Sequence, residues 1–142
     1  MTAINETLKN IVLSIPEFCK SHWLLRIPLT IIILQSGIAK FPLTVEDATS
    51  YDLPFYLWIT AAIGEIVAGV ALVFGGLVRG WFGDAVSRLG GLIIAGILVG
   101  VIVTTNWGSI VDILLYDHLH VLLLVAGLYF GLRGNDLTKE GI

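Results

Sequence analysis

Residues 54–78 read PFYLWITAAIGEIVAGVALVFGGLV, an apolar run that contains one charged residue, Glu65. A helix needs about 20 predominantly apolar residues to cross the roughly 30 Å hydrocarbon core of a bilayer, and this run is long enough. A membrane β-strand would alternate polar and apolar residues, whereas this run is apolar on every face. The stretch therefore predicts a transmembrane helix.

Three further apolar blocks predict helices at about residues 23–41, 87–106 and 117–133. The third span is free of ionisable residues from Leu89 to Thr105. The fourth is short, and the preceding stretch from Ile110 to Tyr116 either extends it or lies along the interface as a separate turn. Together the blocks predict an all-α polytopic membrane four-helix bundle over residues 23–134, followed by a polar cytoplasmic tail at 135–142.

The composition excludes a soluble monomer. Of the 142 residues, 56% are hydrophobic and 13% are charged, about half the charged fraction of an ordinary soluble domain. Most of the surface must face something other than water. The net charge of -3 provides no positive field for nucleic acid. The single Cys19 permits neither an internal disulfide nor a CxxC redox pair, and we predict no metal and no covalent cofactor.

Residues 1–22 differ from the apolar blocks because polar residues separate apolar ones that recur at helical spacing. These apolar residues are Ile4, Leu8, Ile11, Val12, Ile15 and Phe18. The pattern predicts an N-terminal amphipathic interfacial helix. Direct contact with lipid and docking on the bundle or a partner are both open. The segment lacks the apolar core and small-residue cleavage site of a secretory signal, so we expect it in the mature protein.

Lysine and arginine are distributed unequally between the two ends of the predicted spans. Seven fall at one end and only Lys40 at the other; the seven are Lys9, Lys20, Arg26, Arg79, Arg88, Arg133 and Lys139. Because positive charge accumulates on the cytoplasmic side of membrane proteins, this bias predicts that both termini are cytoplasmic. The loops at residues 42–53 and 106–116 then lie outside.

Small residues indicate which helix faces meet, because they let two helices approach closely in a bilayer. The third span has GxxxG at Gly96 and Gly100, and the fourth has it at Gly127 and Gly131. On the second span, a set of mostly small residues lies within about 60° of Glu65: Trp58, Ala61, Ala62, Ala68, Gly69 and Gly76. We predict that these three faces pack inside the bundle.

The same helical geometry assigns a set of polar and aromatic side chains to the interior: Arg26, Lys40, Glu65, Thr104, Trp107 and His120. Gln35 lies about 180° from Arg26, and His118 points nearly opposite to His120. We take Pro54 and Phe41 to lie at the same depth, at the outer face of the bilayer. Along the helix axes, Glu65 is then roughly 16 Å from Pro54, and Arg26 is roughly 22 Å from Phe41. We predict an Arg26–Glu65 contact near the midplane, with the other four residues at the outer mouth of the same seam.

Several of these positions carry a resemblance to a known family: Arg26, Ser36-Gly37-Ile38-Ala39-Lys40, Gly64-Glu65-Ile66-Val67-Ala68-Gly69 and Gly75-Gly76. In them the chain resembles the DoxX-like family of small four-helix membrane proteins, over roughly Trp23 to Gly134. The resemblance implies a four-helix bundle in the prokaryotic cytoplasmic membrane. For some members it implies an association with thiosulfate:quinone oxidoreductase or thiol-linked redox systems.

Two interpretations of the buried charges stay open. Glu65 with Arg26 either handles protons or binds a quinone, or forms a salt bridge that fixes helix register. Asp117, His118 and His120 either form a site in which an imidazole donates a hydrogen bond to a ligand, or cluster at a helix start. Helical spacing opposes a metal site, because residues two apart diverge by about 200°.

These observations lead to two function hypotheses. The first is a redox-linked membrane subunit that binds a quinone or similar apolar ligand at Arg26, Lys40, Glu65, Thr104, Trp107 and His120. The second is a non-catalytic accessory subunit that docks to a larger membrane complex. A transporter or channel ranks third because few groups could line a path. The expected partners are the lipid bilayer and other membrane subunits or further copies of the chain, and not nucleic acid. Electron transfer would require a quinone or a partner that bears the cofactor.

Overall fold

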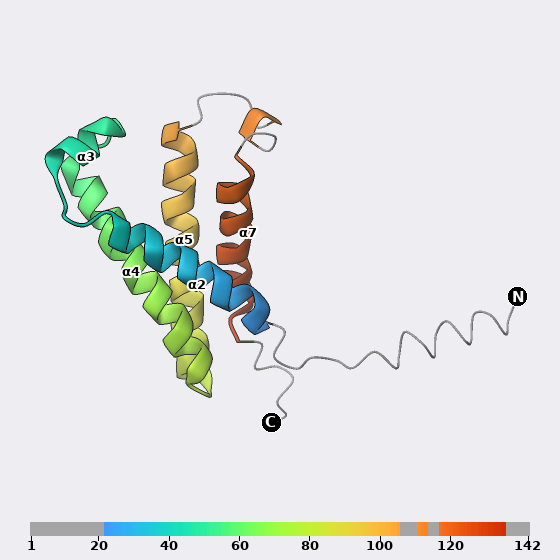
Figure 1. The fold of residues 1–142 in the computed structure, drawn as a ribbon. Helices are drawn as coiled ribbons and strands as arrows, with labels where there is room; N and C mark the ends of the chain where they lie inside the picture. Colours follow the sequence, from blue (N-terminus) through green and yellow to red (C-terminus); the bar gives the residue numbers. More distant parts are fainter. Residues whose placement is uncertain (1–21, 106–110, 114–116, 136–142) are drawn as a thin grey trace, which may run out of the picture.

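The computed structural model describes residues 22–105, 111–113 and 117–135 (Figure 1). These residues form helices and turns without a strand: α2 (His22–Ala39), α3 (Val45–Ser50), α4 (Phe55–Leu77), α5 (Trp81–Thr105) and α7 (His118–Arg133). The all-helical prediction is confirmed for this part of the chain. Nearly all of the predicted amphipathic helix at 1–22 and of the polar tail at 135–142 lies outside the described residues.

Three helices are long and apolar enough to cross a membrane: α2, α4 and α5. They lie over the predicted spans at 23–41, 54–78 and 87–106, although α5 begins earlier, at Trp81. The α7 helix is apolar but has 16 residues. Large apolar side chains on the outside of the helices, such as Ile31, Val67 and Leu122, are half or more exposed. Such a surface suits lipid rather than water, so the chain is a multi-pass membrane protein.

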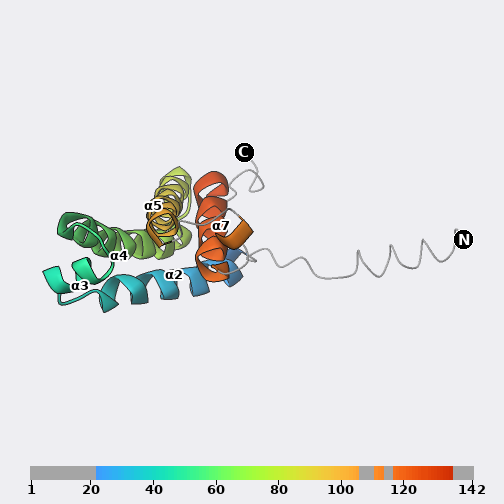
Figure 2. The same cartoon turned by 90° about the horizontal axis from the view of Figure 1, so that it is seen from above.

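The helices pack in chain order. α2 packs on α4, α4 on α5 and α5 on α7, whereas α2 and α7 make few contacts (Figure 2). Apolar side chains from all four helices form the core between them: Leu29, Ile33, Ala68, Leu72, Ile94, Leu98, Leu123, Ala126 and Phe130. We call the end at which α4 joins α5 the turn end, and the opposite end the α3 end.

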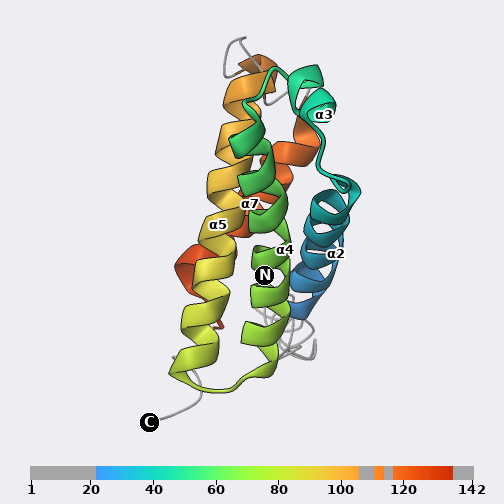
Figure 3. The ribbon, with the colours of Figure 1, turned by 90° about the vertical axis from the view of Figure 1, so that its left-hand side faces the viewer.

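The predicted loop at residues 42–53 contains the short helix α3. The Thr44 hydroxyl accepts a hydrogen bond from the backbone N–H of Asp47 at 3.1 Å, as an N-cap residue does. Ala48 is fully buried and anchors α3 against the bundle. This segment lies at the end of α4, beyond the end of α2 (Figure 3), so α2 ends deeper in the bundle than α4 begins.

The glycine faces correct one prediction and confirm another. Gly127 and Gly131 are buried against α5, as predicted. Gly96 and Gly100 do not pack: both are exposed, and a Cβ added at either would meet nothing within 4 Å. The face of α5 that meets α7 contains Gly91 instead, about 140° around the helix from Gly96. A GxxxG pair shows that two glycines share a face, but not that this face meets a neighbour.

The glycine pair gives a stability prediction. A Cβ at Gly91 would lie 2.6 Å from the carbonyl oxygen of Gly127 and would also meet the backbone nitrogen of Gly131. Backbone atoms of a packed helix cannot yield, so we expect Gly91→Ala to lower the free energy of unfolding by about 1–3 kcal/mol. Gly96→Ala is the matched control and should leave stability unchanged or slightly raised, because alanine favours helix. Thermal unfolding in one detergent compares them, and equal stabilities would contradict the α5–α7 packing.

Candidate functional site

A largely buried ion pair joins the end of α2 to α4. Lys40 Nζ lies 2.6 Å from Glu65 Oε2, and the two side chains are 14% and 7% exposed. Lys40 also donates to the hydroxyl of Ser36 at 3.0 Å, one helical turn earlier. Gly37 allows this close approach, because a Cβ there would lie 3.1 Å from Glu65 Cβ. The intramembrane carboxylate is therefore paired with the lysine that directly follows the neighbouring helix α2.

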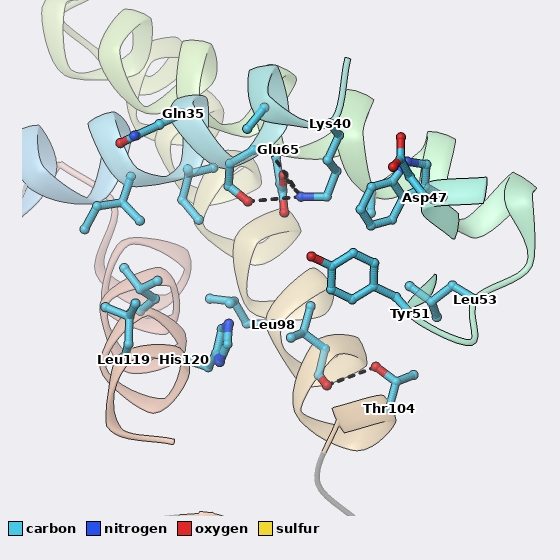
Figure 4. Close-up of a pocket in the computed structure, with 18 residues that line it drawn as sticks. Gln35, Lys40, Asp47, Tyr51, Leu53, Glu65, Leu98, Thr104, Leu119 and His120 are labelled. Atoms are coloured by element: carbon cyan, nitrogen blue, oxygen red, sulfur yellow. Dashed lines mark hydrogen bonds and ion pairs between the residues drawn. The ribbon is translucent and has the colours of Figure 1, made fainter. Parts of the chain in front are cut away.

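This ion pair borders a cavity of about 670 Å³ between α2, the α3 segment, α4, α5 and α7 (Figure 4). Its polar lining comes from all of these elements: Gln35, Ser36, Lys40, Asp47, Tyr51, Glu65, Thr104 and His120. The rest is apolar or aromatic: Ile32, Ile33, Ala39, Leu53, Trp58, Ala61, Leu98, Val101, Leu119 and Leu123. A largely apolar cavity with a few polar groups is the usual form of a small-molecule site.

Two aromatic rings form one wall of the cavity. Tyr51 and Trp58 stack with their centroids 5.2 Å apart and an interplanar angle of 20°. Lys40 Nζ lies 5.4 Å from the Trp58 ring centroid. The Trp58 indole nitrogen is buried and has no hydrogen-bond partner, and the hydroxyl end of Tyr51 is directed into the cavity (Figure 4). The wall thus presents the Tyr51 hydroxyl to the cavity beside the Lys40 ammonium group.

The opposite wall contains His120 at the start of α7. The Nδ1 atom of His120 lies 2.5 Å from Asp117 Oδ1, so the carboxylate orients the imidazole. His118 is exposed, as the helical spacing predicted. Thr104 also lines the cavity, but its hydroxyl lies 3.0 Å from the carbonyl oxygens of Gly100 and Val101 in its own helix.

The structure brings together four of the six predicted site residues and separates a fifth. Lys40, Glu65, Thr104 and His120 line one cavity, and Trp107 lies outside the described residues. Arg26 is at the turn end, where it is fully buried and donates to Ser87 Oγ at 2.9 Å and Asn135 Oδ1 at 2.6 Å. The predicted Arg26–Glu65 contact is therefore wrong.

The error has a geometric cause. Gly37 lies against Glu65, so Arg26, eleven residues earlier in α2, is about 16 Å away along the helix axis. The prediction placed Phe41 and Pro54 at one depth, but the segment containing α3 connects two different depths. Arg26 consequently lies level with Gly76, whose Cβ would lie 2.8 Å from a guanidinium nitrogen.

The polar cluster around Arg26 fastens the helices at the turn end. Its guanidinium group also donates to the carbonyl oxygen of Leu72 and lies 4.6 Å from the Phe130 ring centroid. Asn135 donates through its side chain to the carbonyl oxygen of Gly75 at 2.6 Å, and through its backbone to Asp84 Oδ1 at 2.6 Å. These bonds tie α2, α4 and α5 to the end of α7.

Several of these polar residues were missed by the sequence analysis. Ser36 had a usable signal, since it is one helical turn before Lys40. Gln35 was placed away from the Arg26 face, and it is indeed exposed, yet it also lines the cavity. Tyr51 and Asp47 lie in or beside α3, and Asn135 follows α7, so helical periodicity gave no signal for them.

Comparison with known proteins identifies the family. The family model described as DoxX matches residues 22–107. The chain belongs to the DoxX family. The match in this DoxX protein spans α2 to α5 and includes both residues of the Lys40–Glu65 pair, which confirms the resemblance seen in the sequence. No curated protein and no solved structure matches the chain.

Proposed function

We propose that this DoxX-family membrane protein is a redox-linked subunit that binds a quinone in the cavity beside Lys40 and Glu65. One observation carries the proposal: a cavity of about 670 Å³ with mainly apolar walls borders a buried ion pair and a stacked aromatic pair. The volume is within the range of roughly 300–1,000 Å³ typical of ligand sites. It suits a quinone ring with part of its tail.

The chemistry of the lining matches that of a quinone. The two carbonyl oxygens of the ring accept hydrogen bonds, and Lys40 Nζ and the Tyr51 hydroxyl are donors beside the cavity. The ring itself can lie against the aromatic wall. Glu65 and His120 supply a carboxyl group and an imidazole beside the cavity for proton transfer. Electrons would come from or pass to a partner that bears a redox cofactor.

The proposed orientation places the turn end in the cytoplasm. Arg79, Arg88 and Arg133 lie at this end of the described helices, and Lys40 lies toward the α3 end. Under the positive-inside rule, both termini are then cytoplasmic in a prokaryotic inner membrane, α7 completes a fourth crossing, and the cavity lies in the outer half of the bilayer.

Quinone binding gives the direct test. We expect a short-chain ubiquinone to quench the tryptophan fluorescence of the detergent-solubilised full-length protein with saturation. Glu65→Gln keeps an acceptor for Lys40 but removes the negative charge, and should weaken binding at least tenfold. The control Thr60→Val changes an exposed hydroxyl that bonds to the carbonyl oxygen of Tyr56 in its own helix.

The thermal unfolding of each variant separates function from structure. Folded Glu65→Gln protein with lost binding supports the proposal. Loss of folded Glu65→Gln protein would instead assign the pair to fold stability. Unsaturable quenching of the wild-type protein would contradict quinone binding.

A second candidate is an accessory subunit that docks to a larger membrane complex. The observation that favours it is the exposed pair Gly96 and Gly100 on α5, since small residues let a second helix approach closely. Native gel electrophoresis of mildly solubilised membranes, with mass spectrometry of co-migrating chains and extracted quinone, distinguishes the two candidates. A free monomer without quinone would count against both.

A further inference from the structure

Exposed lining residues mark an opening of the cavity between two helices that diverge: Gln35 on α2 and Leu119 on α7. At the turn end, α2 and α7 meet where the Arg26 guanidinium group lies 4.6 Å from the Phe130 ring centroid. Toward the α3 end, α2 follows α4 and moves away from α7 (Figures 1 and 2). Residues of both helices nevertheless line the same cavity, with Ile32 and Gln35 on α2 and Leu119 on α7. The cavity therefore separates the two helices where they diverge.

Burial increases from this opening toward the ion pair. Leu119 is 55% exposed and Gln35 is exposed, whereas Leu123 and the Glu65 side chain are 6% and 7% exposed. The segment of α2 that borders the opening lies within a helix long enough to span a membrane. Its outer neighbour Ile31 is 58% exposed. In a bilayer, an opening at this place faces acyl chains.

The α3 segment borders the end of the cavity that the proposed orientation places toward water. Asp47, Tyr51 and Leu53 of this segment line the cavity, and Ala48 fastens α3 to the bundle. Asp47 and Tyr51 are exposed at this end, and a ligand that dissolves in the bilayer can reach the cavity sideways without passing them. Gln35 supplies an amide at the opening, where a polar head group would otherwise cross an apolar border.

We propose that the ligand enters sideways from the bilayer through this opening, the α2–α7 portal, defined by Ile32, Gln35 and Leu119. The ligand is then a lipid-soluble amphiphile: its carbonyl-bearing ring reaches the Lys40–Glu65 pair, and its alkyl or isoprenoid tail lies in the portal and the bilayer. This inference rests on the proposed function, and it adds the class of ligand and its route.

Two tritiated probes test the portal in full-length protein reconstituted in nanodiscs. One is a tail-less dimethoxy-methyl-benzoquinone, and the other is the same ring with a decyl tail. Ile32→Trp and Leu119→Trp narrow the portal and should weaken equilibrium binding of the decyl quinone at least tenfold. Binding of the tail-less ring should change less than threefold. The controls Ile31→Trp and Leu122→Trp add the same bulk at exposed positions that do not line the cavity.

The possible results are distinguishable. If both portal variants still bind the decyl quinone, the inferred entry route is wrong, while the proposed function stands. Equal affinity of the wild-type protein for the two probes would also overturn it, because the tail would then contribute nothing. Loss of both probes in the portal variants would place the head group at residues 32 and 119 and contradict the route. Absence of binding of either probe to wild-type protein would overturn the proposed function and this inference together.

Discussion

Arg26→Ala is expected to lower the free energy of unfolding by about 3–5 kcal/mol. The side chain is fully buried, so its removal leaves a cavity between α2, α4 and α7. It also removes the charge-assisted hydrogen bonds to Ser87 Oγ and Asn135 Oδ1. Thermal unfolding in detergent, followed by circular dichroism, measures the change.

Two controls assign this effect to the guanidinium group. Arg79→Ala removes an exposed arginine at the same end and should stay within about 0.5 kcal/mol of wild type. Arg26→Met fills much of the cavity without the hydrogen bonds, so it should recover part of the loss. If Arg26→Ala unfolded at the wild-type temperature, the cluster would have no role in fastening the helices.

The apolar pattern was sufficient to predict α2, α4 and most of α5, but not the short helix α3 or the first residues of α5. A bilayer requires long apolar runs with internally satisfied backbone, so the residues of α2, α4 and α5 follow directly from hydropathy. The buried face of α4 also follows from its small residues: Trp58, Ala62, Ala68 and Gly69 are buried beside Glu65. In both cases the information is local, because it depends on residues within one helix.

Relative depth could not be predicted, because it depends on how the connections fold. The predicted Arg26–Glu65 contact was wrong because α3 and its flanking residues connect the end of α2 to the start of α4, which lies about 12 Å further toward the α3 end. The predicted packing of the Gly96–Gly100 face was wrong for a similar reason. Helical periodicity shows which residues share a face, but not which helix that face contacts. The cavity residue Tyr51 depends on the same connection, because it lies at the end of α3.

The two polar clusters therefore have different roles. Arg26, Ser87 and Asn135 hydrogen-bond to one another, and these bonds hold the helices together. Lys40 and Glu65 also satisfy one another, but they do so at the wall of a cavity large enough for a ligand. Only the second cluster has room for chemistry, and an experiment must separate its contribution to stability from its contribution to binding.

Lys40→Met should destabilise the protein by about 3–5 kcal/mol, because it leaves the buried carboxylate of Glu65 without its cation. The double variant Lys40→Met/Glu65→Leu should return to within about 1 kcal/mol of wild type, since it removes the unpaired charge as well. Arg79→Met, which removes an exposed cation at the turn end, controls for the loss of one positive charge. Chemical unfolding in detergent measures all four proteins.

Quinone binding by the double variant then shows whether the Lys40–Glu65 pair binds the ligand or only stabilises the fold. A protein that is as stable as wild type but binds the decyl quinone at least tenfold more weakly has lost a ligand-binding group and not a structural one. Full binding by the stable double variant would show that the ion pair serves helix packing alone. Failure of the double variant to recover stability would mean that Lys40 and Glu65 act separately, because the energies of an interacting pair are not additive.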